Sequence, residues 1–259
     1  VIIVDNASRD GVPQAIARAH EPDERLRVLY NHANLGFGPA VNVAARVVQG
    51  DALLVLNPDC LLDADTLPRL LGVLRAHPDA GVVGAVACDE NGDPDPASRR
   101  RDPLLRRSLN AMTGRARREA DDARCEGVDV PGPIPENVIE VENVSGALML
   151  LPRAAFDRLR GFDEGYFLHC EDLDLCRRAR DAGYKVLLAG DVRVCHGKGG
   201  SSAHRPVFVS WHKHRGMWRW FRKFDPAAGN PLTCIAVACG IAVHFLATMP
   251  RLWLRRHGA

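Results

Sequence analysis

Four places in the sequence combine a predicted strand end or helix start with a side chain that could bind a cation or accept a proton. They are Asp5, Asp59, the adjacent Glu171 and Asp172, and His196. Carboxylate oxygens and an imidazole nitrogen suit Mg²⁺ or Mn²⁺, with phosphate oxygens completing the coordination. Each residue alone also has an ordinary structural explanation, because aspartates often cap turns and acids in a first helical turn complement the helix dipole. Their meaning as a set therefore depends on the elements that place them.

Strand and helix patterns alternate over the first ninety residues. The predicted strands are 1–4, 26–30, 52–56 and 81–88, and the predicted helices are 13–19, 40–48 and 67–76, with a loop at 34–38. Alternation at this pace predicts an α/β fold with a parallel, doubly wound sheet. Ligands of such sheets bind at the carboxyl ends of the strands. Because Asp5 and Asp59 both follow predicted strands, we expect them at that edge.

The stretch 89–136 has a different composition. It contains six prolines, and eight arginines lie between positions 99 and 118. We expect a mobile insertion with at most one helix, at about 103–120. Two roles stay open for it: a solvated loop, or a segment that closes over the site and contacts phosphates or anionic lipid.

Ordered structure is predicted to resume at 138. The remaining elements are a strand pattern at 138–151 interrupted by Ser145-Gly146, a loop at 162–170, a helix at 171–182, and strands at 184–189 and 192–196. The helix opens on Glu171-Asp172, and the last strand ends at His196.

The tail is a third compositional zone. The segment 211–224 mixes aromatic and basic side chains, as a helix lying among lipid headgroups would. The segment 232–249 then runs 18 residues without Asp, Glu, Lys or Arg, at the lower length limit for a transmembrane helix. Two interpretations stay open: an amphipathic helix packed on the rest of the protein, or a helix in or on a membrane. We therefore divide the chain into an α/β domain at 1–205 and a tail at 206–259.

Composition limits the class of protein. The chain has 259 residues, 46% of them hydrophobic and 25% charged, which is typical of a globular protein and excludes disorder or a fibrous repeat. A formal net charge of +2 excludes binding to nucleic acid through bulk charge. Eight cysteines without a regular spacing do not make a disulfide framework, so we expect reduced thiols in a cytosolic environment.

Six segments, taken in order, resemble one known family. They are 4–11 (VDNASRDG), 34–38 (NLGFG), 56–59 (LNPD), 144–147 (VSGA), 161–164 (GFDE) and 167–175 (FLHCEDLDL). They are similar to motifs of the inverting family 2 glycosyltransferases of GT-A fold, notably the bacterial rhamnosyltransferase-like branch. The resemblance covers about 1–202. It implies a catalytic domain with a Rossmann-like, mostly parallel sheet, followed here by a helical C-terminal tail.

The resemblance also implies roles for individual residues. These are nucleotide-sugar binding by Asp5, Asn6, Ser8, Asn34, Gly36 and Asn57, binding of Mg²⁺ or Mn²⁺ by Asp59 and His196, acceptor or sugar binding by Gly146 and Asp163, and catalysis by Asp172 with Glu171 beside it. Asp172 would take the proton from the acceptor hydroxyl, and attack from the face opposite the nucleotide would invert the anomeric centre. The metal would stabilise the negative charge that grows on the departing diphosphate.

The implied donor is a dTDP- or UDP-linked sugar, with L-rhamnose from dTDP-rhamnose as the best single expectation. The implied acceptor is a glycan or a polyprenyl-linked glycan in cell-envelope polysaccharide synthesis. The protein would work at the cytoplasmic face of the inner membrane, either peripherally or anchored by its tail. No nucleic acid partner is expected.

Two departures from the family pattern affect these expectations. Asn57 stands where the family motif has its first acid, which weakens the negative charge of the site. We also expect the family's opening strand to be missing before Val1. Because that strand lies in mid-sheet, its absence would leave unpaired backbone groups and an incomplete base pocket.

Two other functions are weighed against this one. A nucleotidyltransferase would typically carry a Gly-rich, Lys-containing loop near its N-terminus, and the sequence has none there. A decayed transferase would bind a sugar nucleotide or glycan without catalysis. Intact Asp59, Asp172 and His196 argue against such a non-catalytic module.

The cysteines near the predicted helix at 171–182 allow a zinc site to be considered. The candidate ligands are His169, Cys170, Cys176 and Cys195. Their spacing lacks the paired C-x₂₋₄-C pattern of structural zinc sites, so we do not expect one.

Overall fold

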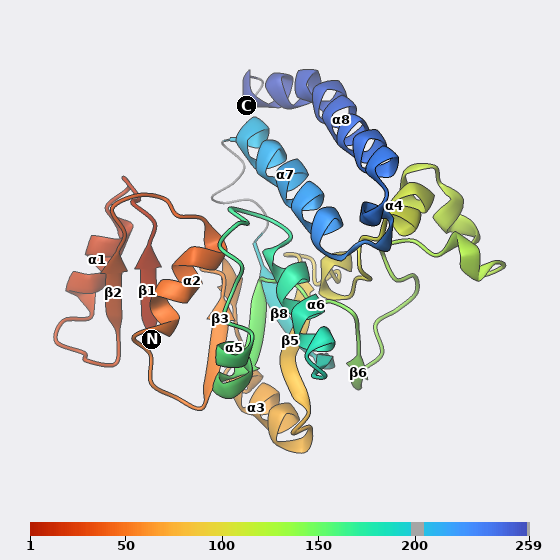
Figure 1. Ribbon diagram of the computed structural model, residues 1–259. Helices are drawn as coiled ribbons and strands as arrows, with labels where there is room; N and C mark the ends of the chain where they lie inside the picture. The colour runs from red at the N-terminus through yellow and green to blue at the C-terminus, as the bar shows by residue number, and fades with distance from the viewer. Residues whose placement is uncertain (198–204, 258–259) are drawn as a thin grey trace.

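The strands form two separate sheets in the computed structural model, which describes residues 1–197 and 205–257, the last seven by their backbone (Figure 1). The smaller sheet pairs β1 (Ile2–Asp5) in parallel with β2 (Arg27–Tyr30). The larger sheet has the order β3 (Ala52–Leu56), β7 (Leu148–Pro152), β5 (Ala80–Cys88), β8 (Lys185–His196) and β4 (Cys60–Leu61), with β6 (Val138–Glu140) also on β8. Within the described residues, β1 forms a ladder with β2 alone.

The larger sheet is mixed rather than mostly parallel, which corrects that part of the expectation. Among its described pairs only β5 and β8 run parallel, while β7 is antiparallel to β3 and β5, and β4 and β6 are antiparallel to β8. The reason lies in the stretch 89–136. The chain leaves it at Val138, which pairs with Ala189, level with the carboxyl half of β5. As a result β7 starts beside the middle of β5 and runs antiparallel to it.

The helices of the α/β domain lie beside these sheets. They are α1 (Val12–Ala19), α2 (Phe37–Ala45), α3 (Thr66–Ala76), α5 (Arg153–Arg158) and α6 (Glu171–Asp181). Helix α1 packs on β2 of the smaller sheet, and α3, α5 and α6 pack on the larger sheet. All of them except α5 lie at or near predicted positions. The sequence did not predict α5 or β4, since elements of six and two residues carry too little periodicity. Helix α2 begins three residues earlier than predicted, directly after the left-handed turn at Gly36. Strand β8 is continuous where two strands were predicted. Its pairing with β5 changes register between Ala189 and Arg193, the region where the gap between the two strands was predicted.

The core lies on both faces of the larger sheet. All nine residues of β5 are buried. On one face Val82 and Met149 pack with residues of α5 and α6, and on the other Val83 and Leu148 pack with Leu70 of α3. Burial on both faces requires a continuous apolar run rather than an alternating one, which is the pattern of 81–88.

The stretch 89–136, expected to be mobile, contains more structure than the single helix predicted for it. It has α4 (Leu105–Met112) and three 3₁₀ turns, η1 (Pro96–Ser98), η2 (Arg115–Arg118) and η3 (Ala123–Cys125). Arg107 pairs with Glu126 at 2.6 Å and with Glu142 at 2.7 Å, and Arg101 pairs with Glu119 at 2.6 Å. These acids lie 18 to 35 residues away in sequence, so the run of arginines alone did not reveal them. The mobility of the insertion stays a prediction.

The tail folds into a helical hairpin of α7 (Pro206–Phe224) and α8 (Pro231–His257), joined through η4 (Pro226–Gly229) (Figure 1). Helix α7 packs on the α/β domain through Trp220, which is 1% exposed beside Tyr166 and Leu173. The inner helix of the hairpin is therefore part of the protein core.

The outer helix, α8, packs on α7 and η4, and most of the apolar side chains in its described part, 231–250, are exposed or half-buried. His214 Nε2 and His244 Nδ1 lie 2.8 Å apart between the two helices. The segment Pro231–Pro250 is long and apolar enough, by length and composition, to cross a membrane. In its most apolar stretch of 18 residues only 6% is buried inside the protein. A helix packed into a soluble core would be mostly buried. The packed-helix interpretation of 232–249 therefore has little support in the structure.

Candidate active site

Residues expected to bind the nucleotide lie together at the ends of β1 and β2. Asp5, the last residue of β1, is buried, and its Oδ1 accepts a hydrogen bond from the Ser8 backbone N–H at 2.9 Å. Asn6 Nδ2 donates to the Gly36 carbonyl at 3.0 Å, and Asn6 Oδ1 accepts from Asn31 Nδ2 at 2.9 Å. The parallel pairing of the two strands brings these distant residues to one edge. Asn31 is a member of this group that the sequence analysis missed.

Gly36 connects this group to the loop before α6. Asn34 Oδ1 accepts a hydrogen bond from the Gly36 N–H at 2.9 Å, which fixes the turn. Gly36 has φ 91°, and a Cβ here would collide with the backbone of Phe167. Phe37 N–H donates to the Phe167 carbonyl at 3.0 Å. Glycine is therefore required where the group around Asn6 and Asn34 touches the loop that leads to Asp172.

Asp59 and His196 meet because β4 pairs with β8. Cys60 is the register partner of His196, and His196 Nε2 lies 3.3 Å from Asp59 Oδ1. Asn57 Nδ2 lies 3.5 Å from the same imidazole nitrogen. The two residues predicted to bind metal are thus side by side at the ends of their strands.

These two residues fit a divalent cation. Within the described chain, the buried Asp59 Oδ1 accepts no hydrogen bond and faces His196 Nε2 at 3.3 Å, an arrangement that a cation bound by both atoms would relieve. Together with Cys60 they place ligand atoms within 4.8 Å of one another. Burial, together with the charge of Asp59, raises the pKa of the Cys60 thiol to about 11, and the thiol donates to the Ala147 carbonyl at 3.4 Å. A carboxylate and an imidazole then remain as ligands, which suits Mg²⁺ or Mn²⁺.

Asp172 lies in the first turn of α6 with both carboxylate oxygens engaged. Its Oδ2 accepts a hydrogen bond from the Gly146 N–H at 3.1 Å, and its Oδ1 accepts from the Leu173 N–H at 2.8 Å. The guanidinium of Arg100, in the insertion, lies 3.9 Å from Oδ2. The side chain keeps 12% of its surface exposed, through which an acceptor hydroxyl can approach. The sequence analysis missed Arg100, for which the only signal was the run of arginines at 99–118.

Glu171, the other member of the pair, has a different environment. It is buried, and its Oε2 has no hydrogen-bond partner in the described part of the chain. Burial, and then the neighbouring charge of Asp172, raise the pKa of Glu171 well above its usual range. The geometry favours Asp172 as the base, because backbone N–H groups orient both of its oxygens and part of its side chain is exposed, whereas Glu171 Oε2 is buried without a partner among the described residues.

The segment 145–147 contacts both Asn57, near the candidate metal ligands, and Asp172, the candidate base. Asn57 N–H donates to the Ala147 carbonyl at 2.9 Å, while Gly146 donates to Asp172. A Cβ on Gly146 would lie 3.2 Å from the Cβ of Asp172, closer than most such contacts. The expected contact of Gly146 with the acceptor or sugar stays a prediction, and in the structure its N–H orients the carboxylate of Asp172.

Asp163, also expected to bind acceptor or sugar, is paired with the tail. Arg219 and Lys223 of α7 lie 2.8 and 2.7 Å from its carboxylate, and Lys223 also lies 2.6 Å from Asp174 of α6. Burial opposes the ionisation of Asp163, but the hydrogen bonds from Lys223 and Arg219 outweigh it and lower its pKa to about 2. Asp163 therefore anchors α7, and its sugar-binding role stays a prediction.

The turn before α6 brings the tail into contact with the site. His169 and Cys170 have φ of 67° and 70°, in the left-handed region. Gly216 of α7 packs directly on this turn, since a Cβ there would lie 2.8 Å from the His169 carbonyl oxygen. Strained backbone of this kind persists when its surroundings hold it in place. Helix α7 therefore supports the turn that carries Asp172.

The four candidate zinc ligands do not come together. Among the described residues, the group of His, Cys and acidic side chains close enough to hold a metal is the one around Asp59 and His196. All eight cysteines are free.

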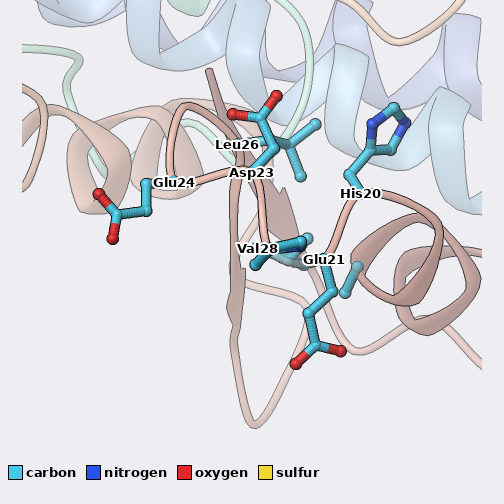
Figure 2. Close-up of a pocket in the computed structure, with 8 residues that line it drawn as sticks. His20, Glu21, Asp23, Glu24, Leu26 and Val28 are labelled. Atoms are coloured by element: carbon cyan, nitrogen blue, oxygen red, sulfur yellow. The ribbon is translucent and has the colours of Figure 1, made fainter.

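An open pocket lies away from these residues, between the end of α1 and β2 (Figure 2). The residues that line it are Ala17, His20, Glu21, Pro22, Asp23, Glu24, Leu26 and Val28. Figure 2 shows the carboxylates of Glu21, Asp23 and Glu24 pointing in different directions, so they do not converge on a ligand. This pocket includes none of the candidate site residues.

Comparison with known sequences agrees with this geometry. Residues 1–127 match the family described as Glycosyl transferase family 2. Over 243 residues the chain is 31% identical to an N-acetylglucosaminyl-diphospho-decaprenol L-rhamnosyltransferase of Mycobacterium tuberculosis, covering 85% of this chain and 76% of that protein. Over 216 residues it is 25% identical to the rhamnosyltransferase WbbL of Escherichia coli, covering 72% of this chain and 78% of that protein.

Solved structures give a matching fold. The mannosyltransferase PcManGT from Pyrobaculum calidifontis, in complex with GDP-Man and Mn²⁺, superposes with a TM-score of 0.57 at 19% identity. The alignment covers 98% of this chain and 64% of that one, so the chain spans less than two thirds of that protein. TarS of S. aureus superposes with a TM-score of 0.53 at 16% identity, covering 88% of this chain and 39% of that one. These likenesses confirm the GT-A fold.

Proposed function

Since the chain belongs to glycosyl transferase family 2, in its rhamnosyltransferase-like branch, we propose that it transfers L-rhamnose from a dTDP-linked donor to a lipid-linked glycan. At the level of class it is a glycosyltransferase for cell-envelope glycans, as its similarity to two rhamnosyltransferases indicates. The donor and acceptor of the finer proposal are supported by the 31% identity to the decaprenol-linked L-rhamnosyltransferase. A single catalytic site is supported above all by one observation: Asp172 is held by Gly146 in the same short segment that holds Asn57, so the proposed base and the proposed metal side share one support.

In the proposed reaction, Asp172 accepts the proton of the acceptor hydroxyl while that oxygen attacks the anomeric carbon of the donor. The bond from the anomeric carbon to the diphosphate breaks, a bond to the acceptor oxygen forms, and the nucleoside diphosphate leaves. Attack from the face opposite the diphosphate inverts the configuration. The hydrogen bonds from Gly146 and Leu173 orient the carboxylate for this transfer.

Asp59 and His196 are the residues that would hold Mg²⁺ or Mn²⁺. The chemistry supplied by such a cation is neutralisation of the negative charge on the departing diphosphate. The buried Asp59 Oδ1, which accepts no hydrogen bond in the described residues and faces His196 Nε2, supports this assignment. Asn57, in place of the first acid of the family motif, directs its amide toward the imidazole and leaves Asp59 as the carboxylate of the motif.

The nucleotide of the donor is assigned to the ends of β1 and β2. Asp5 would accept the imide N–H of a thymine or uracil base. Asn6, Asn34 and Gly36 would line the same side, and their mutual hydrogen bonds support a preformed surface there. Ser8 contributes its backbone N–H to Asp5, which orients that carboxylate.

We also propose that the tail holds the enzyme at the cytoplasmic face of a membrane, next to a lipid-linked acceptor. Helix α7 is bound to the domain through Asp163, and α8 lies on the outer side of α7 with its apolar surface exposed (Figure 1). An exposed apolar helix of this length is favourable in a lipid layer and unfavourable in water. The division into a catalytic domain at 1–205 and a tail at 206–259 stays part of this proposal.

The test is transfer of labelled sugar to a prenyl-diphosphate-linked N-acetylglucosamine, with Mg²⁺ or Mn²⁺ present. We expect product with dTDP-rhamnose from the wild-type protein and a loss of product with Asp172→Asn. If product forms only with a different nucleotide sugar, that sugar is the donor and the rhamnose assignment is wrong. No product with any of dTDP-, UDP- and GDP-linked sugars would overturn the proposal.

A further inference from the structure

Arg100 is held in place beside the base by its own backbone. Its N–H donates to the Asn143 carbonyl at 3.2 Å, and the Asn143 N–H donates to its carbonyl at 3.0 Å. This pairing sets Arg100 next to the segment that leads into Gly146. Its guanidinium then lies 3.9 Å from Oδ2 of Asp172, which is an ion pair too long to be a hydrogen bond.

The guanidinium of Arg100 has donors that no described residue uses. Its Nε is buried without a hydrogen-bond partner, and its closest charged contact is the long pair with Asp172. Of the two neighbouring arginines, Arg101 donates to Glu119 at 2.6 Å. Arg99 donates through Nη2 to the carbonyls of 131–133 at 3.0 to 3.3 Å, although its Nε, like that of Arg100, is buried without a partner among the described residues. Because buried donors without acceptors are costly, the arrangement points to a ligand that supplies one.

A second cation lies near the same turn. Burial is the main cause that lowers the pKa of His169, and the charges of Lys213 and Arg100 lower it further against the opposing charge of Asp172. Lys213 comes from α7 and Arg100 from the insertion, so the two reach the turn from separate elements. Arg100 and Lys213 therefore both act on His169, against the charge of Asp172.

We propose that Arg100 binds the diphosphate of a sugar-diphosphate acceptor, so that the acceptor hydroxyl reaches Asp172 while its phosphate contacts the guanidinium. This inference rests on the proposed transferase function and adds a residue that selects the acceptor. The donor diphosphate is assigned to Asp59 and His196, on the far side of the segment 145–147, which leaves an acceptor phosphate as the anion for Arg100. The planar fork of an arginine suits two phosphate oxygens at once.

The test compares two acceptors that differ only in the diphosphate. One is N-acetylglucosamine joined to a short prenyl chain through diphosphate, and the other is the same sugar joined to the same chain by a simple glycosidic bond. Dissociation constants of both are measured by calorimetry for wild type, Arg100→Gln and Arg100→Lys, and transfer kinetics are measured on the same samples. Arg99→Gln is the matched control, because it removes the adjacent charge without touching Asp172.

Arg100→Gln is expected to weaken binding of the diphosphate acceptor about ten- to a hundredfold and to leave the phosphate-free acceptor within about twofold. Arg100→Lys should recover part of the loss, and Arg99→Gln should behave as wild type. An equal loss for both acceptors, or a fall in kcat alone, would overturn the inference and make Arg100 a residue that positions Asp172. A raised KM for the nucleotide sugar with unchanged acceptor binding would instead place the donor phosphate on Arg100. Since binding is measured apart from transfer, a failure of the wild type to transfer sugar would count against the proposed function alone.

Discussion

The backbone N–H of Gly146 donates to Oδ2 of Asp172 at 3.1 Å, and a Cβ on Gly146 would lie 3.2 Å from the Cβ of Asp172. The next residue, Ala147, accepts a hydrogen bond from Asn57 at the end of β3. The carboxylate assigned as the base is therefore held at a set position relative to the strand that leads to Asp59. Small displacements of such a group lower the rate steeply, because transfer requires reacting atoms in near-attack geometry.

Gly146→Ala is expected to lower kcat roughly 10- to 100-fold, because the added methyl group pushes the base away from its position. The thermal midpoint should change little, since the space is lined by one side chain. Gly72→Ala is the control, because Gly72 lies in α3 with no atom within 4 Å of a built Cβ. That control should keep full activity and gain about 0.5–1 kcal/mol of stability. Wild-type kcat in Gly146→Ala would contradict the positioning role.

Asp172→Asn and Glu171→Gln should separate the two carboxyl groups. Asp172→Asn keeps the shape and removes the proton acceptor, so turnover should fall by roughly 10² or more with donor binding little changed. Glu171→Gln should stay within a fewfold of wild type, since burial already favours the neutral form of Glu171. Single-turnover kinetics and donor titration measure both effects. A large loss in Glu171→Gln with an active Asp172→Asn would exchange their roles.

Asp59→Asn and His196→Ala should each abolish metal-dependent donor binding. The physical reason is that the two side chains supply the ligand atoms that converge at the β4 and β8 ends. Titration of Mn²⁺ followed by electron paramagnetic resonance reports binding directly, and chelator should inhibit transfer by wild type. Asp63→Asn, at an exposed carboxylate nearby, is the control and should bind Mn²⁺ normally. Full transfer by wild type in excess chelator would exclude this metal site.

Asp163 should make the attachment of the tail sensitive to acid. Its folded-state pKa of about 2 lies below the ordinary value of 3.8, so its pairing with Lys223 and Arg219 stabilises the fold above 3.8 and is lost as pH falls toward 2. Trp220 of α7 is buried and should report this change through fluorescence and near-ultraviolet circular dichroism. Asp163→Asn should be less stable at neutral pH and show a smaller change between pH 4 and 2. An unchanged acid transition in that variant would assign it to other groups.

Binding of the tail to anionic vesicles should depend on salt in a chain ending at Pro231 and less so in the full chain. Lys213, Arg215 and Arg222 are exposed on α7, and each basic residue near an anionic surface contributes about 1 kcal/mol. Arg219 and Lys223 should add less, since they are paired with Asp163. Binding of the apolar surface of α8 to the lipid interior should not depend on salt, because salt screens only charges. Co-sedimentation with anionic and neutral vesicles measures the difference. If the full chain sediments with neither kind of vesicle, membrane attachment is refuted.

The sequence by itself determined the family, the candidate residues and most of the elements. Motifs such as 34–38 and 56–59 are local, and the apolar run at 81–88 predicts a buried strand from its own composition. Turn and helix signals act over a few residues, which is why α1, α3 and α6 lie close to their predicted positions. Short elements such as α5 and β4 carry too little of this signal.

Only the tertiary structure decided how these residues are used. It gave Asp172 two backbone N–H donors and left Glu171 Oε2 without a partner among the described residues. It also paired Asp163 with the tail and placed Arg100 3.9 Å from Asp172. It also reversed the direction of β7 within the sheet. The physical reason is that ion pairs, burial and strand register arise from contacts between distant parts of the chain, such as Asn57 with His196 across 139 residues. No local pattern encodes such contacts, because their energies depend on the packing of the whole fold.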